Sequence, residues 1–301
     1  MTITQQQYFG IARKIVSNVT TESWETIPHV CVTDEPEISA FLQILDEINE
    51  GKEKSEHITV NTAMLRIIVE CLKACPKMNS HLHFNKKLVT GRLDTFENID
   101  ISMPVMLKTG EMMTINMHSF EKKTMSQMRD EIHLLISQAN NSDMEKVMMD
   151  AVRDNSIQEL KKGKIAKIFY RLIGLMAGKN KLKTIREKAT KFGKSSCDDS
   201  GLTKKDIEQG TITVSNLGSI YRDWEGECTI LEIIPPQVVA IGIGAIKKNP
   251  VCDDDGNVHA GVNLPITIAF DHRALDMGDI VPFMKKLDEI FKSPAVIKGW
   301  V

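Results

Sequence analysis

The clearest pattern of apolar and polar positions lies near the C-terminus, in residues 264–291. Ile266, Ile268 and Phe270 recur at every second position, which predicts a largely buried strand. Apolar side chains then recur at three- and four-residue spacing over residues 280–290, which predicts one face of an amphipathic helix. Asp279 precedes that run, where a carboxylate caps the first helical N–H groups. This stretch therefore predicts a strand, a sharp turn and a helix.

The same two periodicities predict alternating helices and strands along the rest of the chain. Helices are predicted over residues 7–19, 38–50, 59–75 and 126–139. Strands are predicted over residues 26–32, 99–107, 112–118, 210–218 and 237–245, and residues 81–89 are predicted to form strands around a polar turn at residues 85–87. This mixture predicts an α/β protein of the two-layer α+β kind, with helices packed against a mixed sheet.

Composition excludes several classes of protein. The chain has 301 residues, 42% of them hydrophobic, which suits one large or two ordinary globular domains. Its net charge of −2 gives no bulk attraction to nucleic acid or to an anionic membrane. No window holds the ~18 apolar residues of a spanning helix, and residues 1–10 lack a secretory pattern. The six cysteines form no C-x-x-C pair, which indicates a reducing cytoplasm.

Four ionisable residues stand in the turn between the predicted strand and helix: Asp271, His272, Arg273 and Asp276. Charged groups at the end of an apolar strand are costly to bury, which makes the cluster a candidate site. Only His272 has an ordinary pKa near neutrality, so it is the natural group to move a proton. The alternative is a satisfied core histidine in a charged turn, and spacing alone leaves both interpretations open.

Other histidines give weaker signals. His29 follows Pro28 at the start of a predicted strand, where a structural role is the favoured interpretation. His81 and His83 alternate along one strand, but no carboxylate or cysteine lies near them in the sequence to complete a metal site. We therefore expect no bound metal.

Three strings resemble a known family. Residues 271–276, D-H-R-A-L-D, resemble the D-H-R-x-x-D-G signature of the dihydrolipoyl acyltransferases of 2-oxo acid dehydrogenase complexes, relatives of chloramphenicol acetyltransferase. Met277 stands where that family has glycine. Residues 210–218, G-T-I-T-V-S-N-L-G, resemble its G-x-F-T-I-S-N-L-G string, and residues 232–246 match its I-I-x-x-P-x-x-A-I-L-x-V-G string. The resemblance implies the fold of the coenzyme A-dependent acyltransferases.

The resemblance also implies roles for the site residues. His272 corresponds to the general base, and Ser215 to the hydroxyl that stabilises the oxyanion. Asp276 corresponds to the aspartate that orients the histidine through an ion pair, with Arg13 as a substitute for the family's early arginine. Asn216 and Arg273 are expected to support these groups. In the family the channel lies between the subunits of a trimer, so we expect a homotrimer in which His272 of one chain faces Ser215 of its neighbour.

The expected activity is transfer of an acyl group from acyl-coenzyme A to a thiol, hydroxyl or amine, on a small molecule or a lipoyl-type acceptor. Two alternatives stay open: a donor carried on an acyl-carrier protein, and a catalytically inactive scaffold. The string D-K-A and a Pro/Ala linker are absent from the sequence. We therefore expect a free-standing cytoplasmic catalytic domain over residues 1–301, with no lipoyl group of its own.

Residues 140–206 depart from the family pattern. They contain predicted helices and the apolar string I-A-K-I-F-Y-R-L-I-G-L-M with basic residues around it. Three interpretations stay open: an added helical pair that covers the core, a lid or docking helix that shapes the acceptor pocket, and an interfacial membrane contact. We describe this stretch as a helical insertion.

Overall fold

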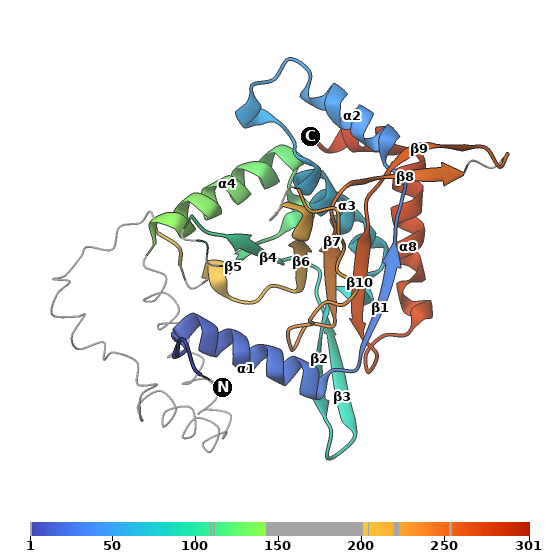
Figure 1. Cartoon of the computed structure of the whole chain (residues 1–301). Coiled ribbons are helices and arrows are strands. Elements are labelled where there is room, and N and C mark those ends of the chain that lie inside the picture. The colour runs from blue at the N-terminus through green and yellow to red at the C-terminus, as the bar shows by residue number, and fades with distance from the viewer. Residues whose placement is uncertain are drawn as a thin grey trace.

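The structure is a computed structural model of the chain, and it describes residues 2–108, 110, 112–142, 201–203, 205–219, 223–252 and 255–301 (Figure 1). The principal helices of these residues are α1 (Ile11–Thr26), α2 (Ser39–Asn49), α3 (Val60–Ala74), α4 (Met125–Asn141) and α8 (Met277–Lys292). The strands are β1 (His29–Asp34), β2 (Ser80–Asn85), β3 (Thr90–Thr95), β4 (Ile101–Met106), β5 (Met112–Met117), β6 (Ile212–Asn216), β7 (Val239–Ile243), β8 (Lys247–Cys252), β9 (Val258–Asn263) and β10 (Ile266–Asp271).

Six strands form the central sheet, in the order β1-β10-β7-β6-β4-β5. β6 runs parallel to both β4 and β7, whereas the other pairs are antiparallel. The expected mixed sheet is therefore confirmed. Two further antiparallel ribbons, β2–β3 and β8–β9, extend from the body of the molecule (Figure 1).

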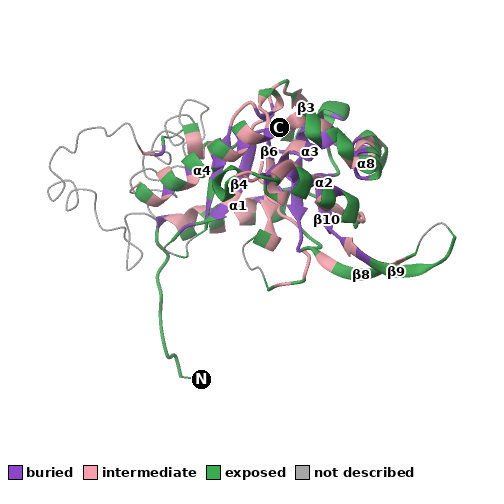
Figure 2. Ribbon diagram, turned by 90° about the horizontal axis from the view of Figure 1, so that it is seen from above, coloured by how far each residue is buried: buried purple, intermediate pink, exposed green. Residues whose placement is uncertain are grey.

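The two faces of the sheet have different coverings. Alternate residues of its central strands join the main core, among them Val214 of β6, Ile241 of β7 and Ile268 of β10. Helices α3 and α8 pack together in that core, and α3 buries residues around most of its circumference, as expected of an interior helix. A smaller cluster of Ile27, Ile233, Ala240 and Ala269 covers the opposite face. Figure 2 shows buried residues gathered along the sheet and exposed ones on the outer helix surfaces.

Several predicted boundaries shift in the structure. The first helix runs from Ile11 to Thr26 and ends two residues before Pro28, consistent with the extended backbone that proline imposes on its predecessor. The strands predicted around a turn within residues 81–89 are confirmed as the β2–β3 hairpin, whose second strand lies further along the chain, at Thr90–Thr95. The strand predicted over residues 210–218 shortens to β6 because residues 217–219 form a 3₁₀ turn. None of the described helices is long and apolar enough to cross a membrane.

Most of the expected helical insertion, residues 143–200, lies outside the described residues. The residues on either side of it meet. The backbone N–H of Leu202 donates a hydrogen bond of 2.9 Å to the hydroxyl oxygen of Ser142, just after the end of α4. The chain therefore leaves and re-enters the described fold at one point.

Candidate functional site

The turn between β10 and α8 presents His272 at the surface. All six residues of β10 are buried, and the turn is closed by backbone hydrogen bonds from Ala274 and Leu275 to the carbonyl of Asp271, at 2.9 and 3.0 Å. The backbone N–H of His272 donates to the carbonyl of Pro28 at 3.1 Å. The His272 side chain is 52% exposed. The alternative of a buried core histidine is therefore wrong.

One nitrogen of the His272 ring is fixed by neighbours on the same turn. Nδ1 lies 3.2 Å from the carbonyl oxygen of Leu275 and 3.2 Å from Oδ1 of Asp276. Both neighbours are acceptors, so in the neutral ring Nδ1 carries the hydrogen and Nε2 carries the free lone pair. The turn thus holds the imidazole in the tautomer that a general base requires at Nε2.

Asp271 and Arg273 form the ion pair that supports this turn. The Asp271 carboxylate is buried, and its two oxygens accept from Nε and Nη2 of Arg273 at 2.9 and 2.6 Å. The backbone N–H of Arg273 also donates to Asp271 Oδ1 at 2.9 Å. The guanidinium lies 5.6 Å from the ring centre of Phe84 on β2. Arg273 therefore neutralises a buried charge and joins the β2–β3 ribbon to the turn that carries His272.

Met277 is the first residue of α8, and its side chain is half exposed. Positive φ among the described non-glycine residues occurs at Val89 and Ser119, so Met277 does not adopt a backbone that favours glycine. Methionine at this position therefore requires no strained backbone.

Ser215 lies near the end of β6, on the face of the sheet opposite the main core. Ile212 and Val214 point into that core, so Thr213 and Ser215 share the other face. The Thr213 hydroxyl donates to Oε1 of Gln237 at 2.7 Å and has a structural partner. Among the described residues, no such bond occupies the partly buried Ser215 hydroxyl. Ser215 therefore retains a donor for a ligand.

Asn216 secures the end of β6. Its Nδ2 donates to Oδ1 of Asn61 on α3 at 2.9 Å, and its Oδ1 accepts from the backbone N–H of Ser219 at 3.0 Å. Both ends of this side chain are therefore used to fix the turn that follows Ser215. The supporting role expected of Asn216 at the site stays a prediction.

Ser215 and His272 stand far apart within one chain. Ser215 is in register with Gly242 of β7, and Gly242 is in register with Thr267 near the start of β10. His272 directly follows the last residue of β10, five positions beyond Thr267. With about 3.3 Å per residue along a strand and about 4.8 Å between strands, their Cα atoms are roughly 19 Å apart. Their side chains do not meet in a single chain.

Arg13 does not take the place of the expected arginine within the chain. It lies exposed on α1, and the ion pairs formed by the described residues do not join it to Asp276. Asp276 instead pairs with His272, four residues earlier on the same turn. The expected Arg13–Asp276 pair is therefore wrong for the isolated chain, because the aspartate has a nearer partner.

His29 has the structural role that its position predicted. Its Nδ1 lies 2.9 Å from the carbonyl oxygen of Ile27, and its Nε2 accepts from the backbone N–H of Ile233 at 3.1 Å. The Ser23 hydroxyl donates to the carbonyl oxygen of Ile233 at 2.7 Å. Together Ser23 and His29 hold residue 233 against the start of β1, and both ring nitrogens of His29 have structural partners.

A contact that the sequence does not reveal lies beside Ser215. A Cβ built on Gly242 would lie 2.8 Å from Cδ1 of Leu231, so the Leu231 methyl groups rest directly on the Gly242 backbone. Gly242 is the register neighbour of Ser215. The apolar character of residue 231 was visible in the sequence, but no pattern placed it over β7.

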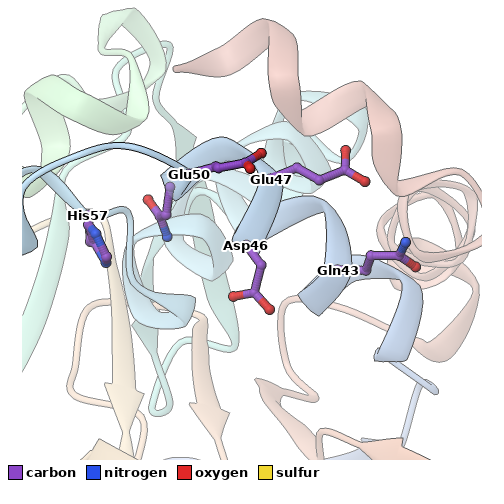
Figure 3. Close-up of a pocket in the computed structure, with 6 residues that line it drawn as sticks. Gln43, Asp46, Glu47, Glu50 and His57 are labelled. Atoms are coloured by element: carbon purple, nitrogen blue, oxygen red, sulfur yellow. The ribbon is translucent and has the colours of Figure 1, made fainter.

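An open hollow of about 440 Å³ lies along α2, away from the predicted site residues (Figure 3). Figure 3 shows its acidic side chains projecting around the hollow, which is lined by Gln43, Asp46, Glu47, Asn49, Glu50 and His57. Three carboxylates would repel a polyanionic ligand such as coenzyme A. In the described ranges, no group of three or more His, Cys, Asp or Glu side chains is arranged to hold a metal ion.

A family model and two curated relatives all match the chain to the same kind of acyltransferase. Residues 2–152 and 177–298 match the family model of 2-oxoacid dehydrogenases acyltransferase (catalytic domain). The dihydrolipoyllysine-residue acetyltransferase component of the Rickettsia bellii pyruvate dehydrogenase complex is 22% identical over 288 residues, which cover 95% of this chain and 52% of that protein. The mitochondrial counterpart from Saccharomyces cerevisiae is 22% identical over 286 residues, which cover 94% and 45%. The chain thus spans about half the length of these relatives.

Solved structures share the fold. A probable dihydrolipoamide acetyltransferase from Listeria monocytogenes superposes with a TM-score of 0.67 at 18% identity, covering 96% of this chain and 94% of that one. The dihydrolipoamide acetyltransferase of Azotobacter vinelandii gives a TM-score of 0.67 at 17% identity, covering 98% and 94%. The sheet order and its helical layer are therefore those of a known architecture.

Proposed function

The chain belongs to the family of 2-oxoacid dehydrogenases acyltransferase catalytic domains, and from that premise we propose that it transfers an acyl group from acyl-coenzyme A to a thiol, hydroxyl or amine. The acceptor is a small molecule or a lipoyl-type group. The observation that carries the proposal is the His272 turn, where two acceptors hold Nδ1 and leave Nε2 as the base.

The transfer is a single displacement through a tetrahedral intermediate. The acceptor attacks the thioester carbonyl while Nε2 of His272 removes its proton. The carbonyl oxygen becomes an oxyanion that accepts a hydrogen bond from the Ser215 hydroxyl. The carbon–sulfur bond then breaks, and the coenzyme A thiolate takes the proton back from His272. The base contributes about 10²–10⁴-fold and an oxyanion donor about 10²–10³-fold to the rate.

This mechanism requires two copies of the chain, since His272 and Ser215 are at opposite ends of one sheet. We place Ser215 of one copy against His272 of the next, so that repetition of one contact closes a ring. A homotrimer is the proposed assembly. Each ring then has as many composite sites as subunits.

The four-residue spacing between His272 and Asp276 supports their assignment to the site. In the Azotobacter vinelandii enzyme, the residues investigated for a role in the catalytic mechanism are a serine, a histidine and an asparagine four positions after the histidine. In this chain, Asp276 stands four positions after His272. Asp276 is therefore proposed to orient the imidazole, with Arg273 and Asn216 in support.

A thiol-release assay tests the proposal. Acetyl-coenzyme A is supplied with a panel that includes dihydrolipoamide, a hydroxyl acceptor and an amine. The wild-type chain should release thiol, and His272→Ala should reduce the rate by about 10²–10⁴-fold.

His83 provides a matched control for that experiment. Its side chain is also 52% exposed, and its Nε2 lies 3.2 Å from Asp94 Oδ2. His83→Ala should keep the wild-type rate. Equal losses in the two variants would contradict the role of His272. Absence of release from free and carrier-bound donors alike would support the scaffold alternative. Release from a carrier-bound donor alone would support the alternative of a donor carried on an acyl-carrier protein.

A further inference from the structure

Residues 228–233 cross the Ser215 face of the sheet as a segment that is anchored at both ends. At one end, the Thr267 hydroxyl of β10 donates to the carbonyl oxygen of Cys228. At the other end, Ser23 and His29 bind the carbonyl and the N–H of Ile233, at 2.7 and 3.1 Å. Leu231 lies between these anchors and packs with the small apolar cluster that contains Ala240. The position of its side chain is therefore set by the segment around it.

The side chain of Leu231 occupies the space over Gly242. Its Cδ1 and Cδ2 would lie 2.8 and 3.2 Å from a Cβ at that position. Gly242 is buried and lies in register between Ser215 of β6 and Thr267 of β10. Residues in register on adjacent strands share a face, about 4.8 Å apart. Leu231 therefore bounds the volume directly beside the Ser215 hydroxyl on the β7 side.

We infer that Leu231 sets the size of the acyl group that the site accepts, and that the wild-type chain favours short acyl groups such as acetyl. This inference rests on the proposed function, in which Ser215 donates to the thioester carbonyl oxygen. The acyl substituent is joined to that carbonyl carbon, so it extends within a few bond lengths of Ser215. A longer or branched substituent directed toward β7 meets the Leu231 methyl groups.

The test compares acyl-chain preference in paired variants. Leu231→Ala removes the methyl groups and should raise the ratio of kcat/KM for hexanoyl- over acetyl-coenzyme A by about tenfold or more. Ile230→Ala is the matched control, since Ile230 is the adjacent apolar residue and is 54% exposed. It should leave the ratio unchanged. An unchanged ratio in Leu231→Ala would overturn the inference.

Two further measurements make the outcome independent of turnover. Titration calorimetry with thioether analogues of acetyl- and hexanoyl-coenzyme A should show the same tenfold change in relative affinity for Leu231→Ala. If the wild type binds these analogues but releases no thiol, the proposed function fails and the affinity ratio still decides the role of Leu231. If neither analogue binds either protein, both ideas are overturned.

The second measurement is a thermal melt of Gly242→Ala in the two backgrounds. The added methyl should lower the melting temperature in the wild-type background, where it meets Leu231, and should do so much less in Leu231→Ala. Equal shifts in both backgrounds would show that Leu231 does not rest on Gly242. This result would overturn the inference whatever the activity of the variants.

Discussion

Ser215 and His272 lie at opposite ends of one sheet, with Ser215 level with the start of β10 and His272 just beyond its end. A site that uses both side chains therefore needs two copies of the chain.

Mixing two inactive variants should restore activity. Ser215→Ala retains His272 and His272→Ala retains Ser215, so a contact between unlike subunits contains both wild-type groups. In randomly reassembled closed rings, about a quarter of the contacts join the two intact groups, so about a quarter of the wild-type specific activity should return. The measurement is thiol release after joint refolding or co-expression. A rate no greater than the average of the separate variants would contradict the composite site.

Substitution of Asp276 should have a smaller effect than substitution of His272. The Asp276 carboxylate is 79% exposed, and the carbonyl of Leu275 supplies a second acceptor for His272 Nδ1 at the same 3.2 Å. An exposed pair of this kind contributes up to about 1 kcal/mol, so Asp276→Asn should lower kcat by about two- to fivefold. Steady-state kinetics checks this, with Asp46→Asn on α2 as the control. A hundredfold loss would mean that Asp276 does more than orient the ring.

The Asp271–Arg273 pair should show strong coupling in unfolding experiments. Arg273→Ala leaves the buried Asp271 carboxylate without its partner, and the free energy of unfolding should fall by about 3–5 kcal/mol. The double variant Asp271→Asn with Arg273→Ala removes both charges and should recover part of that loss. Urea titration of the wild type, Asp271→Asn, Arg273→Ala and the double variant measures the coupling energy. Additive losses would show that the two side chains act independently.

Thiol reactivity should separate the cysteines by burial. Burial raises the pKa of the Cys71 and Cys75 thiols, and the Cys75 thiol also donates to the carbonyl of Asp279 at 3.0 Å. A raised pKa keeps these groups protonated as the pH rises from 7 to 9, and the thiolate is the species that reacts. Iodoacetamide should therefore label exposed Cys252 well before either of them, as followed by peptide mass spectrometry.

Denaturant provides the control for that labelling experiment. Unfolding should make Cys71 and Cys75 react at rates similar to that of Cys252. Equal rates in the native protein would mean that α3, which carries Cys71, opens readily from the core.

The spacing of apolar residues in the sequence correctly predicted which side chains of β10 and α8 are buried. Alternation placed the buried residues of β10, and the three- and four-residue spacing placed Ile280 and Phe283 on the inner face of α8. The charged turn and the hydroxyl-bearing strand were recognised from short strings whose residues are neighbours in the sequence. The catalytic roles of His272, Ser215 and Asp276 stay predictions.

Contacts between distant segments were not predictable in the same way. Arg13 was expected to pair with Asp276, but in the structure Asp276 pairs with His272. The periodicity of apolar residues does not show which charged side chain an exposed carboxylate will contact. The contact between Leu231 and Gly242 depends on how residues 228–233 cross the sheet, and that path is fixed by Thr267, Ser23 and His29. Such contacts arise from tertiary packing, which overrides local propensity.

The hydrogen bond between Leu202 and Ser142 brings together the two ends of the segment formed by residues 143–200. Because the two ends of this segment lie next to each other, residues 143–200 can be deleted and replaced by a short linker of glycine and serine residues. Closing a short flexible linker costs little entropy. A miniaturised version without residues 143–200 should keep the same sheet. Its acyl-transfer rates, compared with those of the parent, would then show whether residues 143–200 contribute to catalysis or to the choice of acceptor.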